Sequence, residues 1–110
     1  HFFKNMEPND FLCLLKNSQC LIGNSSVGIR ECAYLAVTVV NIGTRQHGRN
    51  RGGNVVDVGY EKKVIINAIK EQIRNKNIVS ENIYGEGDSG VKIANILAET
   101  ELTFHKKIMY

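Results

Sequence analysis

Three short apolar runs constrain the fold of this chain most, because each is followed by polar or glycine-rich residues and lies next to segments with helical spacing. Short runs of this kind, two of them rich in β-branched residues, are typical of buried strands. The runs are 20–23 (CLIG), 37–42 (VTVVNI) and 54–58 (NVVDV). Their alternation with helices predicts the α/β class, with a parallel sheet covered by helices on both faces.

Helical spacing of apolar residues marks four further segments. A stripe of Ile65, Ile69 and Ile73 identifies the longest helix, and Asp88 or Ser89 is suited to cap the last one. The expected helices span residues 8–17, 27–35, 61–75 and 88–102. In the last helix, the side chains expected to face inward are Val91, Ala94, Leu97 and Ala98.

The small number of strands indicates how much of a domain is present. A doubly wound sheet usually has about 5–6 strands, and a three-stranded parallel sheet would leave exposed edges. The sequence contains no linker and no internal repeat. We therefore expect residues 1–110 to form a single partial domain, the C-terminal part of a larger α/β protein.

Composition and charge exclude several classes of protein. Hydrophobic residues make up 43% and charged residues 23% of the chain, which excludes a disordered segment. No apolar run reaches the ~20 residues of a membrane helix, and the start lacks the pattern of a signal peptide. A net charge of +3 is too small to indicate nucleic acid binding. We therefore expect neither a nucleic acid nor a membrane partner.

Cysteine and histidine usage predicts the compartment and argues against a metal site. Cys13, Cys20 and Cys32 lie in apolar stretches and have no C-x-x-C spacing. This pattern predicts three buried free thiols in a reducing cytoplasm. The histidines are scattered along the chain, so no zinc site is expected.

Two loops follow the first two predicted strands, where open α/β sheets bind their ligands. Residues 23–28 (GNSSVG) offer small residues, two hydroxyls and the start of a helix, which suit a diphosphate. Glu31, about one turn further on, suits a sugar diol. Residues 43–52 carry three arginines and a histidine, which favour an anion clamp. A plain serine-capped helix and a solvated basic loop are the structural alternatives.

These loops carry a family resemblance that extends over nearly the whole chain. IGNSSVGIREC (22–32) and VVNIGTRQHGRNRGGNVVDV (39–58) resemble the hydrolysing UDP-N-acetylglucosamine 2-epimerases, and so do KNMEPNDFLCLLKNS (4–18) and IYGEGDSGVKIANIL (83–97). The resemblance implies a glycosyltransferase-B-type fold with two Rossmann-like domains. This chain resembles the latter part of the C-terminal domain, and the catalytic N-terminal domain is expected to be absent from it.

The resemblance also implies a function and a set of ligand contacts. The family eliminates UDP from a UDP-sugar and adds water to release N-acetylmannosamine, a step in the biosynthesis of sialic-acid-type sugars. No residue of this chain corresponds to a catalytic one, no cofactor or metal is expected, and the chain alone is expected to be inactive. The complete enzyme is expected to be a cytoplasmic homo-oligomer. The implied UDP contacts are Ser25, Ser26, Glu31, Arg45, Gly28 and the backbone of Met6.

The sequence departs from the family pattern at four positions. Ala36 and Thr38 stand where Gly and Pro are usual, and Asn50 and Gly53 stand where Glu is usual. Ala36 is expected to be strained if this position needs a positive φ.

The residues leave other functions open. A glycosyltransferase donor domain and a non-catalytic UDP-sugar-sensing module are the alternatives. The substrate is open between UDP-N-acetylglucosamine and a UDP-diacetamido-trideoxy sugar.

Overall fold

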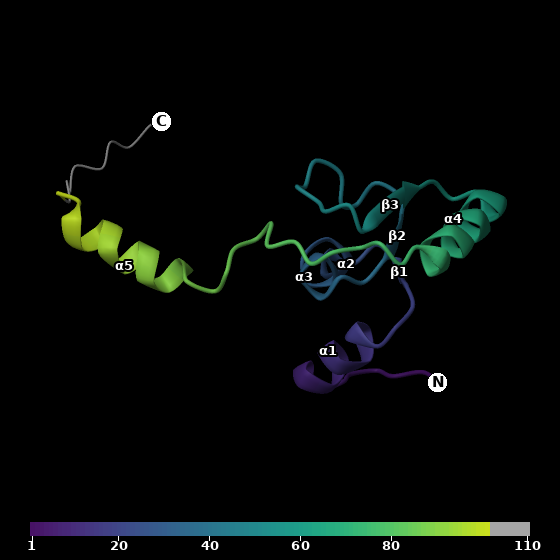
Figure 1. Ribbon diagram of the computed structural model, residues 1–110, viewed down its shortest axis with the longest axis horizontal. Coiled ribbons are helices and arrows are strands. Elements are labelled where there is room, and N and C mark those ends of the chain that lie inside the picture. Colours follow the sequence, from purple (N-terminus) through teal and green to yellow (C-terminus); the bar gives the residue numbers. More distant parts are fainter. Residues whose placement is uncertain (102–110) are drawn as a thin grey trace, which may run out of the picture.

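The three apolar runs form a three-stranded parallel sheet, as predicted, and the strands lie side by side in the order in which they follow along the chain (Figure 1). The computed structural model describes residues 1–101. Its strands are β1 (Leu21–Gly23), β2 (Val39–Ile42) and β3 (Val55–Val58). Val39 lies beside both Leu21 and Val55 in the register, so these three residues share one face of the sheet.

This face is covered by the helices that precede and follow β1. They are α1 (Pro8–Lys16), α2 (Ser26–Ile29) and α3 (Glu31–Leu35). Their apolar side chains pack on the sheet because burial removes this surface from water. The buried core cluster on this side consists of Leu15, Cys32, Val37 and Val39.

The opposite face is covered by α4 (Lys62–Arg74), which contacts β2 and β3. Val40 alternates with Val39 and is fully buried there. The predicted stripe of Ile65, Ile69 and Ile73 is half-buried. The predicted α/β class, with helices on both faces of a parallel sheet, is therefore confirmed.

The expected helix over 27–35 is in fact two short helices, α2 and α3, joined at Arg30. Arg30 has φ −100° and ψ −73°, which interrupts the regular helix. Gly28 lies in α2 against the sheet, where a Cβ atom would be 2.8 Å from Val39 Cγ1. The glycine thus lets α2 approach the strands closely, and the chain bends before α3 begins.

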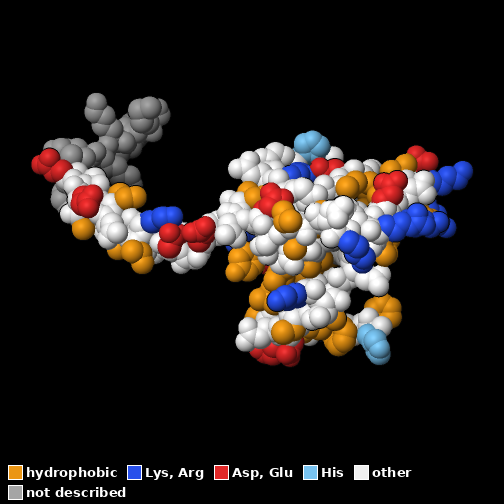
Figure 2. Space-filling view, viewed as in Figure 1, with side chains coloured by type: hydrophobic (Ala, Val, Ile, Leu, Met, Phe, Trp, Pro, Cys, Tyr) orange, Lys and Arg blue, Asp and Glu red, His pale blue; other side chains and the backbone are white. Residues whose placement is uncertain are grey.

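The last helix, α5 (Ser89–Glu99), was predicted correctly as a helix but wrongly as a buried one. It extends away from the sheet (Figure 1), and Figure 2 shows apolar side chains on its surface. Periodicity predicts an apolar face, but it does not provide a partner for that face. The side chains expected to face inward are all exposed, namely Val91, Ala94, Leu97 and Ala98.

The two ends of α5 also differ in part from the prediction. Asp88 occupies the N-cap position without a side-chain cap hydrogen bond, and it forms an ion pair with Lys92 at 2.8 Å instead. The helix ends at Glu99, and the predicted end at Leu102 lies outside the described residues.

The three cysteines differ in burial, contrary to the expectation that all are buried. Cys13 is exposed, Cys20 is half-buried and Cys32 is buried. Cys13 lies on the outer side of α1, because the stripe of this helix buries Leu15 instead. Burial raises the pKa of the Cys32 thiol to about 12, and the charge of Glu31 adds to this shift.

Candidate functional site

The serine loop, residues 23–28, leads from β1 into α2 at the carboxyl end of the sheet. Ser25 is the N-cap residue, and its Oγ accepts a hydrogen bond from Val27 N at 3.3 Å. Ser25 is exposed and Ser26 is half-buried. Both hydroxyl groups can donate to an anion. Since α2 has four residues, its dipole is weaker than that of the longer helix expected from the sequence.

The arginine loop, residues 43–53, follows β2 and also lies at the carboxyl end of the sheet. Its three arginines do not form the expected clamp, because Arg51 is engaged within the protein. The Arg51 guanidinium pairs with Asp57 and donates from Nη2 to Gln46 O at 2.6 Å. Arg45 and Arg49 are exposed, and neither forms an ion pair within residues 1–101. Arg45 is therefore accessible to an anionic ligand.

Gln46 connects the two loops. Its side chain is almost fully buried, although its neighbours Arg45 and His47 are exposed. The Gln46 Nε2 group donates to Asn24 O at 2.7 Å. The structure therefore holds the serine loop and the arginine loop together, as their shared position after parallel strands predicts.

A polar network under this contact was not found from the sequence. Asn41 and Asp57 are direct neighbours in the β2–β3 register, and Asn41 Nδ2 donates to Asp57 Oδ1 at 2.7 Å. Asp57 in turn holds Arg51. The one sequence signal for it is that Asn41 and Asp57 interrupt apolar strands at the same distance before each strand ends.

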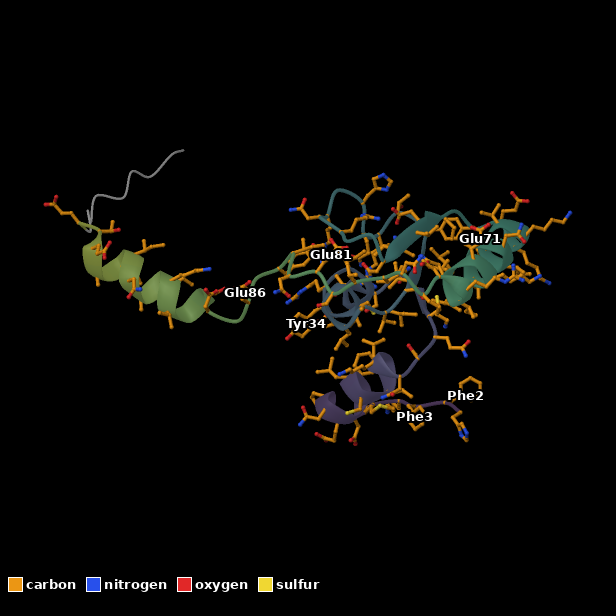
Figure 3. The ribbon with its side chains drawn as sticks, in the orientation of Figure 1. Phe2, Phe3, Tyr34, Glu71, Glu81 and Glu86 are labelled. Atoms are coloured by element: carbon orange, nitrogen blue, oxygen red, sulfur yellow. The ribbon has the colours of Figure 1, made fainter. Side chains whose placement is uncertain are left out.

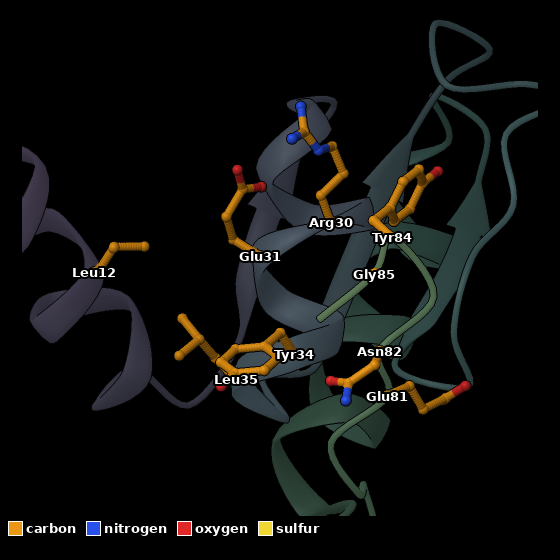
Figure 4. A pocket seen from close by; sticks show the side chains of 9 residues that line it. All are labelled: Leu12, Arg30, Glu31, Tyr34, Leu35, Glu81, Asn82, Tyr84 and Gly85. Carbon is orange, nitrogen blue, oxygen red and sulfur yellow. The ribbon is translucent and has the colours of Figure 1, made fainter. Parts of the chain in front are cut away.

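Glu31 lies in a different hollow, which has a volume of about 280 Å³ (Figure 4). Its Oε2 atom is buried and has no hydrogen-bond partner among the described residues. This buried acceptor can bind hydroxyl donors. The serine loop does not line the hollow. The lining residues come from α1, the junction of α2 and α3, α3 itself and the segment after α4, and are Leu12, Arg30, Glu31, Tyr34, Leu35, Glu81, Asn82, Tyr84 and Gly85.

Residues 80–85 pass over α3 and the arginine loop on the way to α5. Glu81 N donates to Ala33 O at 3.0 Å, and Ser80 Oγ donates to Tyr34 O at 2.6 Å. In Figure 3, Glu81 lies on the body of the protein, whereas Glu86 lies toward α5. This segment therefore forms one wall of the hollow that contains Glu31.

Two of the four departures from the family pattern contact this segment through their backbones. Gly53 N donates to Glu81 Oε1 at 2.8 Å, and Asn50 O accepts from Tyr84 Oη at 2.7 Å. A glutamate at position 53 would add a second negative charge near Glu81. Asn50 and Gly53 are thus compatible with the observed packing of the arginine loop.

The other two departures lie at the amino end of the sheet. Ala36 has φ 55° and ψ 40°, so the condition under which strain was expected at this position is met. This conformation is strained for alanine. Thr38 is buried, and its Oγ1 donates to Gln19 O at 2.9 Å. Neither residue belongs to the two loops.

The remaining predicted contacts have less direct support from the structure. Met6 is half-buried and precedes α1. Gly28 is buried, and its N–H is engaged in a hydrogen bond to Ser25 O at 3.2 Å. The structure therefore supports a packing role for Gly28 in α2. Residues 1–101 contain no cluster of three potential metal ligands. They also contain no helix of the length and hydropathy required to span a membrane.

The fold and the position of the loops define a class of protein. A parallel sheet with helices on both faces and polar loops after its strands is the arrangement of a Rossmann-like domain. The profile of the UDP-N-acetylglucosamine 2-epimerase family matches residues 1–98. The chain therefore belongs to this family, as its motifs predicted.

Curated relatives agree with this assignment. The chain is 34% identical over 106 residues to "UDP-N,N'-diacetylbacillosamine 2-epimerase (hydrolyzing)" of Legionella pneumophila, covering 96% of this chain and 28% of the relative. It is 35% identical over 87 residues to "UDP-N-acetylglucosamine 2-epimerase" of Neisseria meningitidis, covering 79% and 23%. It is 46% identical over 65 residues to "Polysialic acid biosynthesis protein P7" of Escherichia coli, covering 59% and 17%. The chain thus spans between 17% and 28% of the length of these relatives.

Proposed function

We propose that this chain is the UDP-binding part of a hydrolysing UDP-N-acetylglucosamine 2-epimerase. The enzyme would convert UDP-N-acetylglucosamine, or a related UDP-acetamido sugar, into UDP and the 2-epimeric sugar for the biosynthesis of sialic-acid-type sugars. The observation that carries this proposal is the contact between the serine loop and the arginine loop, through Gln46 Nε2 and Asn24 O at 2.7 Å. Relatives named for UDP-sugar 2-epimerases support it.

The two loops would stabilise the leaving group. Elimination of UDP places additional negative charge on the diphosphate, and fixed hydrogen-bond donors lower the free energy of such a state. The hydroxyls of Ser25 and Ser26 and the exposed guanidinium of Arg45 are suited to donate to it. We assign Gly28 to the same loop, where its packing lets α2 lie close to the sheet.

The nucleoside would lie toward α1 and α3. The unpartnered Oε2 of Glu31 is suited to accept hydrogen bonds from the ribose hydroxyls. The backbone of Met6, before α1, is assigned to the uracil by family resemblance. These assignments leave proton transfer to residues outside this chain, so we expect the chain alone to be inactive, as one partial domain of a larger, homo-oligomeric, cytoplasmic enzyme.

Substitution of the serine loop tests the diphosphate contact. In the complete protein, Ser26→Ala should weaken UDP binding by roughly 10- to 100-fold, because it removes a hydrogen bond to a charged group. Calorimetric titration with UDP measures this effect. Ser18→Ala is the matched control, since Ser18 Oγ bonds to Leu15 O at the other end of the sheet. Unchanged affinity in Ser26→Ala would remove the serine loop from the site.

A ribose analogue separates the roles of Glu31 and Arg45. Arg45→Ala should weaken the binding of UDP and of 2′,3′-dideoxy-UDP alike. The loss of affinity should be larger at low salt than at high salt. Glu31→Gln should weaken UDP more than the dideoxy analogue, which has no diol to lose. Equal losses for both ligands in Glu31→Gln would contradict the ribose assignment.

Turnover distinguishes the enzyme from the alternatives. The complete protein should release N-acetylmannosamine, or its diacetamido counterpart, from the matching UDP-sugar. UDP binding without turnover would favour a sensing module, and transfer of the sugar to an acceptor would favour a glycosyltransferase. Membership of the epimerase family already argues against the latter.

A further inference from the structure

Gln46 is a buried amide between the exposed residues Arg45 and His47 of the arginine loop. It is 3% exposed, and its side chain reaches across to the loop that follows a different strand. Its Nε2 donates to Asn24 O at 2.7 Å, directly before the two serines. The same residue is bonded to Arg45 in the chain, so its position affects both candidate diphosphate contacts.

The backbone of Gln46 is itself anchored to the sheet. Arg51 Nη2 donates to Gln46 O at 2.6 Å, and Arg51 pairs with Asp57. Asp57 accepts from Asn41, its direct neighbour across β2 and β3. A continuous chain of hydrogen bonds therefore runs from β2 and β3 through Gln46 to the serine loop.

A comparison with Gln72, another buried glutamine, argues against a role in stability alone. Gln72 Nε2 donates to two carbonyls, Val39 O at 3.1 Å and Asn54 O at 3.2 Å. Gln46 makes one such bond, and its Oε1 is buried with no partner among the described residues. A buried polar atom without a partner costs free energy. Asn54 Oδ1, at the amino end of the sheet, is buried without a partner among the described residues as well. What distinguishes Gln46 is that its one side-chain hydrogen bond joins the two loops.

We propose that Gln46 is a positioning residue for UDP binding. It does not touch UDP; it fixes Asn24 so that Ser25 and Ser26 lie at the correct distance from Arg45, and the hydroxyls and the guanidinium converge on one diphosphate. This inference rests on the proposed function. If Gln46 is a positioning residue, removal of its amide must weaken UDP binding by displacing Ser25 and Ser26.

A double-mutant cycle tests this requirement in the complete protein. Gln46→Met keeps the length of the side chain and removes the amide, and it should weaken UDP binding about tenfold. In the Ser26→Ala background, the same change should weaken UDP binding by less than about threefold. The effects of two substitutions are not additive when the residues act as one unit. Gln72→Met is the matched control and should leave the affinity for UDP unchanged.

Hydrogen exchange supplies a second readout. The amides of residues 24–28 should exchange faster in Gln46→Met and at the wild-type rate in Gln72→Met. If Gln46→Met does not fold, Asp57→Asn tests the same chain of contacts, because it weakens the anchor of Arg51. Asp57→Asn should also speed hydrogen exchange in the serine loop. It should weaken UDP binding less in the Ser26→Ala background than in the wild-type background.

The outcomes separate this inference from the proposed function. Loss of affinity in Ser26→Ala, together with an unchanged affinity or an additive loss in Gln46→Met, overturns the positioning role and leaves the UDP site intact. An unchanged affinity in Ser26→Ala overturns the serine site and the positioning role with it. A non-additive loss with faster exchange supports both.

Discussion

The two ends of the three-stranded sheet are held by different kinds of interaction. At the amino end, buried neutral side chains donate to backbone carbonyls. Gln72 bonds to Val39 O and Asn54 O, Asn54 Nδ2 bonds to Val37 O at 2.9 Å, and Thr38 bonds to Gln19 O. At the carboxyl end, the buried bond from Gln46 Nε2 to Asn24 O is joined by charged contacts: Arg51 pairs with Asp57, whose side chain is 53% exposed.

This difference separates stability from ligand binding. Buried hydrogen bonds are costly to break, whereas half-exposed ion pairs contribute little to the free energy of unfolding. The amino end therefore secures the fold. The carboxyl end can present exposed groups such as Ser25 and Arg45 without contributing much to stability. Substitutions at the two ends should accordingly affect different measurements.

The largest effect on stability is expected at the amino end. Gln72→Met should lower the free energy of unfolding by about 2–3 kcal/mol, because Val39 O and Asn54 O lose a buried donor. Urea denaturation of the complete protein measures this change. Gln46→Met should lower it by less, since it removes one hydrogen bond. Equal losses in the two variants would break the comparison.

Gly28 contacts both ends of the sheet, and its substitution should have an intermediate effect on the free energy of unfolding. Its carbonyl accepts from Asn54 Nδ2 at 3.4 Å, and it belongs to the serine loop. Gly28→Ala should lower the free energy of unfolding by about 1–2 kcal/mol, because the added methyl group would meet Val39. It should also weaken UDP binding as the loop shifts. Reduced stability with unchanged UDP affinity would restrict Gly28 to packing.

A smaller effect of opposite sign is expected at Ala36. Glycine adopts its φ of 55° without the clash of a Cβ atom, so Ala36→Gly should raise the free energy of unfolding by about 1 kcal/mol. The affinity for UDP should stay the same, because Ala36 lies at the amino end. Thermal or urea unfolding of both variants measures the difference, and a destabilised Ala36→Gly would show that the strain is negligible.

The reactivity of the cysteines tests the packing of the core between the two ends without any substitution. At pH 8, a thiol reagent should modify Cys13 first and Cys32 last, because burial raises the pKa of Cys32 to about 12. The folded state favours the protonated thiol of Cys32. The contribution of this thiol to the free energy of unfolding is therefore present below the ordinary thiol pKa. This contribution is lost as the pH rises toward 12. Rapid modification of native Cys32 at pH 8 would contradict the burial.

Local patterns predicted much of the fold and part of the site. The three strands, α1 and α4 follow from periodicity, and the serine and arginine loops follow from their position after parallel strands. The family motifs identified Ser25, Ser26, Glu31 and Arg45 as candidate contacts. Periodicity could not show that Cys13 and α5 are exposed, because burial depends on what else packs against each apolar face.

The sequence by itself determined the order of strands and helices and the family, because spacing and motifs are local properties of the chain. The tertiary structure decided which polar side chains are free to bind a ligand. Arg51 is held by Asp57, and Gln46 bonds to Asn24 across 22 positions of sequence. Such contacts depend on strand register and loop path. The topology brings the two loops to one end of the sheet, but the sequence does not mark which residues of the loops bond to each other.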